Sequence, residues 1–306
     1  MVIFLLILKM MQALHGSLVA LVTPMNSKGD IDFNSLEKLI EWHIANDTNG
    51  IVSVGTTGES ATLTVDEHLK VIEHTVKCVN GRIPVIAGSG SNSTAQAIET
   101  TTESHRIGAD FSLLVTPYYN RPNQKGLIEH YIKIADECNI NQILYNVPSR
   151  TGCDILPETV EVLSKHQNII GIKEAVNNQK RINELVKISK QSQEDFLIFS
   201  GDDESFFNLI TSGGHGVISV AANVIPKSIS DICKLIIEEK IEEANEINKK
   251  YQNLYDLLFI ESNPIPVKWI LFKMGFIQNS LRLPLVNLDK KFEENIMSEM
   301  IKLKLL

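Results

Sequence analysis

Short apolar segments recur along the chain between residues 17 and 220. They are rich in β-branched residues and end at Gly, Thr, Ser, Pro or Asn, a pattern typical of buried strands. Eight strands are predicted: Ser17–Val22, Ile51–Val54, Pro84–Ala87, Phe111–Val115, Gln142–Asn146, Ile169–Lys173, Phe196–Ser200 and Val217–Val220.

Segments with apolar residues three and four positions apart lie between these strands, as expected for amphipathic helices. They are Ser35–Ala45, Thr64–Cys78, Thr94–Ile107, Gly126–Cys138, Pro157–His166, Gln179–Ser189 and Glu204–Thr211. Strand and helix therefore alternate, and successive strands start about 20 to 35 residues apart, the length of one β-α unit.

Near-continuous apolar strands are typical of a parallel sheet that is covered on both faces. Because eight β-α units close a barrel, we predict an α/β fold of the (β/α)8 TIM-barrel type over residues 13–237. An open doubly wound sheet is the alternative, since alternation alone does not show closure. The glycine signature of a dinucleotide fold is not matched, because the nearest segment, residues 88–93, lacks the third glycine.

The two ends of the chain differ from this pattern. Residues 238–306 predict long charged helices without strands, at Glu238–Ile260, Pro266–Met274 and Leu288–Lys304. Residues 1–12 hold an apolar run that Lys9 interrupts, which is too short to span a bilayer and lacks the basic leader of a secretory signal. We expect these residues to be a disordered extension or a mis-assigned start, and we expect no membrane partner.

Composition narrows the functional classes. The 306 residues carry 29 Lys and Arg against 37 Asp and Glu, a net charge of −8, and 43% of them are hydrophobic. The apolar content excludes disorder, and the acidic balance argues against nucleic acid. The cysteines (Cys78, Cys138, Cys153, Cys233) form no C-x-x-C pair, and no histidine stands at finger spacing, so we expect no metal site and a reducing cytoplasmic location.

Polar residues gather where the predicted strands end, which is the edge that carries the chemistry of such barrels. Lys173 is the most informative, because it closes an apolar strand where a charged ammonium is disfavoured. At a pKa of about 10.4, only about one lysine in 2,500 is neutral at pH 7, so activating this amine requires about 4.6 kcal/mol, most of which desolvation can supply. Strand alternation places Ile169 and Gly171 on the same face as Lys173, and Gly171 leaves room for its stem.

An imine-forming lysine needs a proton shuttle. Tyr145, one strand earlier at the matching height, is the expected donor, and Thr57 and Tyr119 could extend the relay. Structural roles are the alternatives: Lys173 paired with Glu174 or a rim aspartate, and the tyrosines as core or interface residues. For Thr57 the alternative is a helix cap.

Four motifs together resemble the pyruvate-dependent class I aldolases, and within them the dihydrodipicolinate synthase family. They are Gly55-Thr56-Thr57-Gly58-Glu59, Thr116-Pro117-Tyr118-Tyr119, Tyr145-Asn146-Val147-Pro148-Ser149-Arg150-Thr151-Gly152 and Gly171-Ile172-Lys173-Glu174. The match covers nearly everything after residue 12.

The resemblance implies condensation of pyruvate with aspartate 4-semialdehyde, the first committed step of diaminopimelate and lysine synthesis, through a Schiff base on Lys173. Tyr145 would be the acid and base, and the tyrosine matching Tyr119 would come from a neighbouring subunit. The carboxylate of pyruvate would be held at Thr56 and Thr57, and family positions matched by Gly201 and Ile218 line the pocket. The resemblance further implies a homotetramer and no cofactor, because the imine is itself the electron sink.

Arg150 distinguishes this activity from its relatives, because a guanidinium grips a carboxylate bidentately and the second substrate carries one. N-acetylneuraminate lyase and sugar-acid aldolases are the alternatives within the family, since they usually have another residue at this position. A ligand-sensing barrel without catalysis is the alternative of a different class. A barrel that has lost catalysis would usually lack the lysine or the tyrosine, and Lys173 and Tyr145 are both present.

Lysine inhibits many members of this family at a site near the dimer interface, whose positions match Ser60, Ala61, His68, Asn92 and Tyr118. Two positions depart: Val65 replaces a common histidine, and Gln96 replaces a glutamate. A lost carboxylate partner removes about 1.5 to 3 kcal/mol, or ten-fold or more in affinity. We therefore predict weak inhibition in a titration of activity with L-lysine, and half-inhibition well below millimolar would contradict this prediction.

Overall fold

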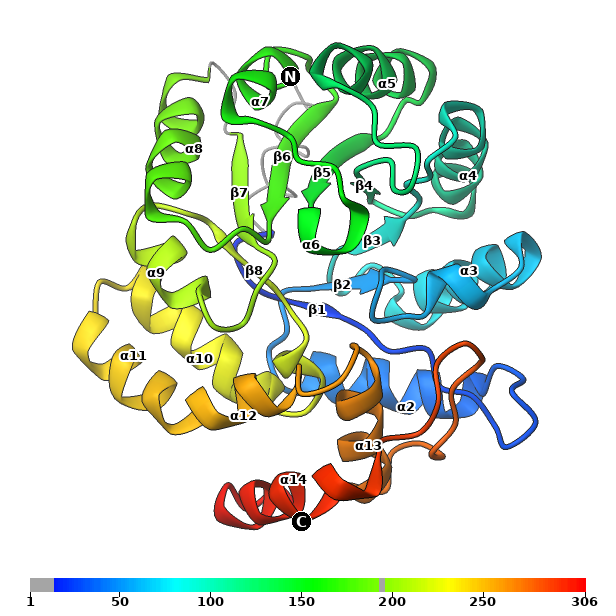
Figure 1. The fold of residues 1–306 in the computed structure, drawn as a ribbon, viewed down its shortest axis with the longest axis vertical. Helices are drawn as coiled ribbons and strands as arrows, with labels where there is room; N and C mark the ends of the chain where they lie inside the picture. The colour runs from blue at the N-terminus through cyan, green and yellow to red at the C-terminus, as the bar shows by residue number, and fades with distance from the viewer. Residues whose placement is uncertain (1–13, 193–195) are drawn as a thin grey trace.

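Eight parallel strands close into a barrel in the computed structural model, which describes residues 14–192 and 196–306 (Figure 1). The strands are β1 (Gly16–Ala20), β2 (Gly50–Ser53), β3 (Val85–Gly88), β4 (Phe111–Val115), β5 (Asn141–Asn146), β6 (Ile169–Glu174), β7 (Leu197–Ser200) and β8 (Gly216–Ser219). Pairing of β8 with β1 closes the sheet, so the TIM-barrel prediction is confirmed and the open sheet is excluded. All eight predicted strands are present.

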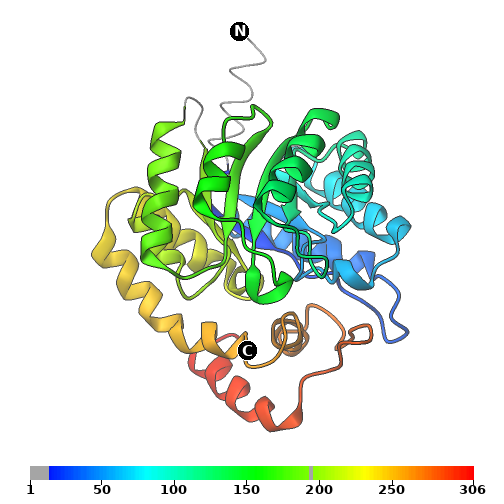
Figure 2. The same ribbon diagram turned by 45° about the horizontal axis from the view of Figure 1, so that its top comes forward.

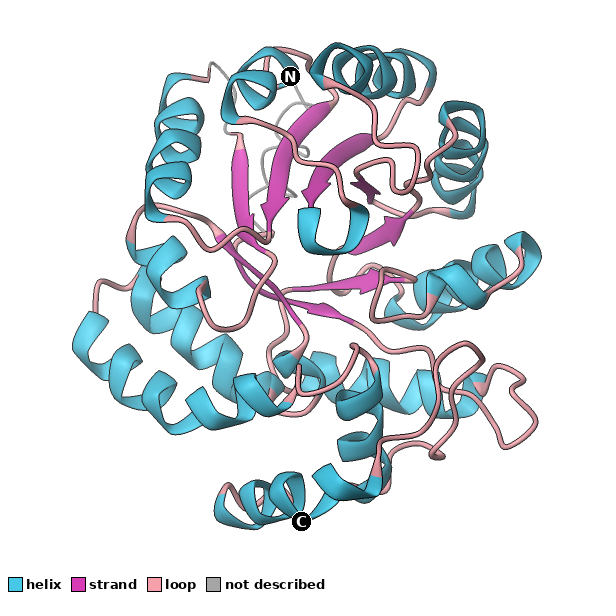
Figure 3. Cartoon of the chain, viewed as in Figure 1, coloured by secondary structure: helices cyan, strands magenta, loops and turns pink. Residues whose placement is uncertain are grey.

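Helices enclose the barrel, as the cyan ribbons around the magenta strands show in Figure 3. The seven predicted helices correspond to α2 (Phe33–Ala45), α3 (Val65–Val79), α4 (Thr94–Ile107), α5 (Gln124–Glu137), α7 (Pro157–Leu163), α8 (Gln179–Gln191) and α9 (Phe206–Thr211). The prediction omitted α10 (Pro226–Ile237), which follows β8. Proline at the first helical position starts α10, where a missing N–H costs no intrahelical bond.

Side-chain caps fix the starts of several helices. The hydroxyl of Thr64 accepts from the backbone N–H of Glu67 while the Glu67 side chain accepts from the Thr64 N–H, a capping box that starts α3. Ser93 and Asn123 cap α4 and α5 in the simpler way. Each such cap typically contributes about 1 kcal/mol.

Two apolar layers hold the barrel together. The inner layer fills the barrel with side chains such as Leu18, Phe111, Ile143 and Phe199. The outer layer packs the other faces of the strands against the surrounding helices. Each fully buried Leu, Ile or Phe contributes about 1.5–3 kcal/mol, so a strand buried on both faces is fixed from both sides.

The register of β6 departs from simple alternation. Opposite β5, the pairing shifts between Gln142 and Ile143, so that Gln142 pairs with Ile169 and Ile143 with Gly171. Ile169 consequently belongs to the outer layer and Ile170 to the inner one. The prediction that Ile169 shares a face with Lys173 is therefore wrong, because the bulge adds one residue to the strand.

The C-terminal part consists of α11 (Ile241–Asn248), a 3-10 turn η3 (Lys249–Tyr251), α12 (Gln252–Leu257), α13 (Ile265–Lys273) and α14 (Lys290–Lys302). The predicted single helix over residues 238–260 is thus divided. The Tyr255 hydroxyl donates to Oδ1 of Asn248 at 3.1 Å, and Nε2 of Gln252 donates to the Asn248 carbonyl oxygen at 3.3 Å. The side-chain oxygen and the backbone oxygen of Asn248 therefore both accept hydrogen bonds from side chains at the point where the helix is interrupted.

This C-terminal part lies across one end of the barrel, beneath the strands in the view of Figure 2. Its α13 packs against the 3-10 turn η2 (Ala221–Asn223), which follows β8, while the short helix α6 (Pro148–Thr151) follows β5. In the described parts of the chain, no helix has both the length and the apolar character needed to cross a membrane. The expectation for residues 1–12 lies outside the described residues.

Candidate active site

A cavity of about 360 Å³ opens at the carboxyl ends of the strands. It brings together the predicted residues Thr56, Thr57, Tyr145, Arg150 and Lys173, together with Gly201. The cavity is also lined by Ala20, Val52, Gly55, Leu113, Val147, Ser149, Ala175, Asp202, Val220, Phe259, Ser262 and Asn263. The last three come from the C-terminal part, which therefore completes the wall of the cavity.

Lys173 lies in the floor of this cavity and is 5% exposed. Its backbone pairs with that of Tyr145 on the neighbouring strand, and its Nζ lies 4.3 Å from the centroid of the Tyr145 ring. Burial lowers the pKa of Lys173 to about 7; the charge of Asp203 opposes this shift, and that of Arg150 adds to it. A substantial fraction of the amine is therefore an uncharged nucleophile at neutral pH.

Gly201 makes the space for the lysine stem. A Cβ at Gly201 would lie 3.0 Å from Cε of Lys173, whereas a Cβ at Gly171 would lie 2.5 Å from the carbonyl oxygen of Leu197. The expectation that Gly171 leaves room for Lys173 is therefore wrong. Gly171 instead permits the close approach of β6 and β7, and a side chain there would push the two strands apart.

Glu174 does not pair with Lys173. Its buried carboxylate accepts from Nδ2 of Asn146 at 3.1 Å, from the N–H of Val176 at 2.8 Å and from Arg181 at 3.2 Å. Arg181 also forms an ion pair with Asp154 at 2.6 Å. Successive residues of a strand point to opposite faces, so Glu174 belongs to this outer network. No ion pair of Lys173 is found among the residues that the structure describes, which argues against the structural alternative.

Asp203 is the buried acid whose charge acts on Lys173, a role that the sequence did not reveal. Its carboxylate accepts from the Ser219 hydroxyl at 2.5 Å and from the N–H groups of Val220 and Ala221 at 3.0 and 2.9 Å. Burial nevertheless raises the pKa of Asp203 to about 6. At neutral pH a mostly ionised Asp203 therefore favours the cationic form of the amine and limits the fall of its pKa.

The hydroxyl next to Tyr145 is that of Thr56. A hydrogen bond to the Thr56 side chain and the charge of Arg150 both counteract the rise in the Tyr145 pKa that burial causes. The Thr57 hydroxyl instead accepts from Nδ2 of Asn263 at 3.0 Å. The structure thus places the Thr56 hydroxyl beside Tyr145, and the part of Thr57 in the relay stays a prediction.

Backbone strain holds the turn that carries both threonines. Val54 has a φ of 50° and Glu59 a φ of 56°, conformations that non-glycine residues rarely adopt. A Cβ at Gly58 would lie 2.9 Å from the Cα of Val54, and one at Gly88 would lie 2.6 Å from the Val54 carbonyl oxygen. Glycine is therefore required at both positions for the turn to fold against β3. Strain of this kind is concentrated at functional sites.

A fully buried ion pair anchors the same turn to the C-terminal part. The ammonium of Lys268 in α13 donates to the Glu59 carboxylate and, at 3.1 Å, to the carbonyl oxygen of Thr23. Both side chains are 0% exposed. Burial lowers the pKa of Lys268, although the neighbouring Glu59 opposes this effect. The turn therefore cannot shift without exposing or separating two buried charges. Glu59 precedes the 3-10 turn η1 (Ser60–Thr62) without a side-chain cap bond, and Thr64 caps α3.

Two predicted residues lie outside the cavity. Tyr119 is 91% exposed with a φ of 71°, so its ring does not reach Tyr145 within one chain. Ile218 is fully buried in the inner layer of the barrel, and its neighbour Val220 lines the cavity instead. Asn263 was not predicted as a site residue. Its only sequence signal is the short polar dipeptide Ser262-Asn263 between two predicted helices.

A smaller cavity of about 160 Å³ collects the residues of the predicted lysine site. Ser60, Ala61, His68 and Tyr118 line it, and Asn92 donates to the Tyr118 carbonyl oxygen at 3.2 Å beside it. Val65 and Gln96, the two positions that depart from the sensitive pattern, line the same cavity, which is further enclosed by Leu63, Ser89, Gly90, Ser91, Thr100 and Val115. Nε2 of His68 lies 2.8 Å from the Gly88 carbonyl oxygen.

A buried lysine with a pKa near neutrality, set against a tyrosine at the carboxyl rim of a (β/α)8 barrel, defines the class of Schiff-base-forming class I aldolases. The family model for the dihydrodipicolinate synthetase family matches residues 13–303. The chain therefore belongs to this family, as the sequence motifs indicated.

Similar proteins carry a consistent name. The 4-hydroxy-tetrahydrodipicolinate synthase of Stutzerimonas stutzeri is 52% identical over 285 residues, 93% of this chain and 97% of that protein. The chloride-inhibited dihydrodipicolinate synthase of Acinetobacter baumannii, solved with pyruvate, is 45% identical with a TM-score of 0.92, over 95% of this chain and 99% of that one. A monomeric dihydrodipicolinate synthase variant is 40% identical with a TM-score of 0.94, over 96% and 98%.

Replacing Lys268 with Met should destabilise the protein by about 3–5 kcal/mol, because it leaves Glu59 buried and unpaired. The measurement is the free energy of unfolding in urea. The double variant Lys268→Met/Glu59→Gln removes both charges and should cost less than the sum of the single variants. A loss below about 1 kcal/mol in Lys268→Met would contradict the anchoring role.

The Lys173 amine should react with a small acylating reagent half-maximally near pH 7, because its pKa is lowered to about 7 and only the neutral amine reacts. Competitive labelling across a pH series, quantified by mass spectrometry, measures this. Lys133 is the internal control: its ion pair with Glu137 raises its pKa, so it should label only at much higher pH. Coincident labelling curves for the two lysines would contradict the prediction.

Proposed function

We propose that this protein is a 4-hydroxy-tetrahydrodipicolinate synthase, a lyase that condenses pyruvate with L-aspartate 4-semialdehyde in diaminopimelate and lysine biosynthesis. The observation that carries the proposal is the buried Lys173 amine, whose pKa is lowered to about 7, facing Tyr145 in a cavity that also holds Arg150. The name shared by relatives about half identical over most of the chain supports the choice of substrates.

The first step joins Lys173 to pyruvate. The neutral amine attacks the keto carbon, a proton moves to the carbonyl oxygen, and loss of water leaves the imine. Tyr145 is the donor of this proton because its hydroxyl belongs to the same cavity and its ring lies against the amine. The resulting iminium withdraws electrons from the adjacent methyl carbon, which loses a proton and then attacks the aldehyde. The imine thus acts as the electron sink, and the step requires no metal or organic cofactor.

The two threonines take separate roles in this proposal. Thr56 extends the proton relay, since its side chain is bonded to the Tyr145 hydroxyl. Thr57, oriented by Asn263, holds the carboxylate of pyruvate together with the backbone of the turn. Tyr119 joins the relay of a neighbouring subunit, which fits its exposure in the single chain.

Arg150 selects the second substrate. Its guanidinium lines the mouth of the cavity, where it can bind the carboxylate of the semialdehyde through two hydrogen bonds. Gly201 lines the pocket through its backbone. A larger residue is disfavoured there because its Cβ would crowd the side chain of Lys173. Ile218 supports the floor from inside the barrel and takes no part in contacting the substrate.

The proposal extends to assembly and location. We place the catalytic barrel at residues 13–237 and the helical part at 238–306, and we propose a homotetramer, a dimer of dimers, in the cytoplasm. The exposed Tyr119 and the family resemblance support the oligomer. One protein of similar fold, a dihydrodipicolinate synthase variant, is described as monomeric.

Incubation with pyruvate and borohydride should trap a pyruvyl adduct on Lys173, because the reagent reduces the imine to a stable amine. Mass mapping of the digested protein locates the adduct. Lys173→Ala should give no adduct, while Lys187→Ala, which removes a lysine of α8 outside the cavity, should label like the wild type. An adduct on another lysine, or none, would overturn the mechanism.

Substrate pairs distinguish the proposal from its relatives. We expect turnover of pyruvate with aspartate 4-semialdehyde and none of N-acetylneuraminate. Arg150→Ala should raise KM for the semialdehyde, since the lost hydrogen bonds concern the second carboxylate. Pyruvate should still be trapped on Lys173, with the optimum at a higher pH because the charge that helps to lower the lysine pKa is gone. Cleavage of N-acetylneuraminate at a comparable rate would favour the lyase alternative.

A further inference from the structure

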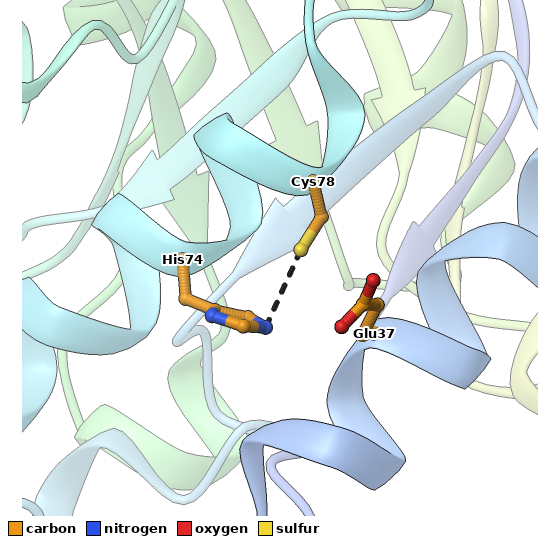
Figure 4. A group of neighbouring side chains, drawn as sticks. All are labelled: Glu37, His74 and Cys78. Atoms are coloured by element: carbon orange, nitrogen blue, oxygen red, sulfur yellow. Dashed lines mark hydrogen bonds between the residues drawn. The ribbon is translucent and has the colours of Figure 1, made fainter.

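Three potential metal ligands converge on the outer surface of the barrel, away from the catalytic cavity. His74 and Cys78 lie one turn apart on α3, and Glu37 approaches them from α2 (Figure 4). The Cys78 Sγ lies 3.3 Å from Nε2 of His74, and one ligand atom from each of the three residues lies within 4.8 Å of the others. A thiol, an imidazole and a carboxylate therefore share one small volume.

We propose that Glu37, His74 and Cys78 form a binding site for a divalent cation of the zinc class. Zinc binds thiolate sulfur at about 2.3 Å, imidazole nitrogen at about 2.0–2.1 Å and carboxylate oxygen at about 2.0–2.2 Å, so the ligand atoms of a tetrahedral site lie about 3.5 Å apart. The separation of 3.3 Å between Sγ of Cys78 and Nε2 of His74 is close to this value. The Glu37 oxygen lies within 4.8 Å of both atoms, and we expect it to move closer when a metal binds. The site offers three protein ligands and leaves the fourth position for water.

The site is accessible and partly preorganised. Glu37 is exposed, while His74 and Cys78 are half-buried, so a cation can enter from solvent between the two helices. The His74 ring packs against that of Phe33, with centroids 4.9 Å apart, and this contact restricts the orientation of the imidazole. Spacing on one helix also helps, because residues at i and i+4 share a face.

Local charge favours a cation at this position. The carboxylates of Glu37 and Glu41 and the guanidinium of Arg82 are the charges that act on the Cys78 sulfur. The positive charge of Arg82 is largely engaged, since its guanidinium is paired with Glu41 and donates to the Cys78 carbonyl oxygen. Because Glu41 and Arg82 largely neutralise each other, the Glu37 carboxylate supplies the negative charge that attracts a cation to this position. On binding, the S–H proton leaves to solvent and the sulfur bonds to the metal.

The sequence argument against a metal site considered only paired-cysteine and finger spacings. It therefore overlooked the i, i+4 interval between His74 and Cys78, and it had no means of placing Glu37 of another helix beside them. The other cysteines, Cys138, Cys153 and Cys233, are buried. They lie in no such group within the described residues.

Titration of the full-length protein with Co²⁺ tests the proposal, because cobalt replaces zinc and reports its ligands spectroscopically. We expect a thiolate-to-cobalt charge-transfer band and visible d–d bands that saturate at one equivalent per chain. Zn²⁺ should abolish both bands by displacing the cobalt. Saturating Zn²⁺ should also raise the melting temperature, since a ligand that binds the native state stabilises it.

Matched variants identify the ligands. Cys78→Ser and His74→Gln should each weaken zinc binding by about 100-fold or more, Glu37→Gln should weaken it by about ten-fold, and Cys78→Ser should also remove the charge-transfer band. His166→Gln, which removes a histidine paired with Asp136 elsewhere on the surface, should bind like the wild type. Circular dichroism checks that each variant is folded. Absence of stoichiometric binding in the wild type, or unchanged binding in folded Cys78→Ser, would overturn the proposal.

Discussion

Removal of one ammonium group from water is the constraint on which the site depends. Lys173 has its amine inside a closed sheet, where water cannot solvate a full charge, and its pKa falls to about 7 as a result. A barrel that was open between β8 and β1 would admit water to its interior and raise the pKa of Lys173 toward its ordinary value. Activation of the amine therefore depends on closure of the sheet by the pairing of β8 with β1.

Two charged residues near Lys173 change its pKa in opposite directions. Asp203 stabilises the cation and Arg150 destabilises it, so the amine is poised between its two protonation states. Two backbone amides and a serine hydroxyl hold the Asp203 carboxylate in place, so its position relative to Lys173 is fixed. Its charge is lost as the pH falls below about 6, because burial raises its pKa to about 6. Glu174, adjacent in the chain, has no such influence through direct pairing because it points into the outer layer, where Arg181 binds it.

The sequence was sufficient to predict the strands, the barrel and the central residues of the cavity. The spacing of apolar residues along each strand and the order of the motifs predict these features. Both can be read from the sequence without knowledge of contacts between distant segments. The errors share a different origin. The bulge opposite Ile169, the space provided by Gly201 and the bond from Asn263 to Thr57 all depend on contacts between distant segments. A pattern along one strand contains no information about a register shift in its partner, and a lone polar dipeptide does not reveal which hydroxyl it will meet.

The anchor between Glu59 and Lys268 has a consequence for the order of assembly in the cell. The two residues are 209 positions apart, so the carboxylate remains hydrated on the nascent chain until Lys268 has left the ribosome. All eight strands are synthesised before that moment, yet the turn that holds Thr56 and Thr57 lacks its buried counter-ion. A chain stalled during translation could therefore close its barrel and still remain unable to shape the pocket.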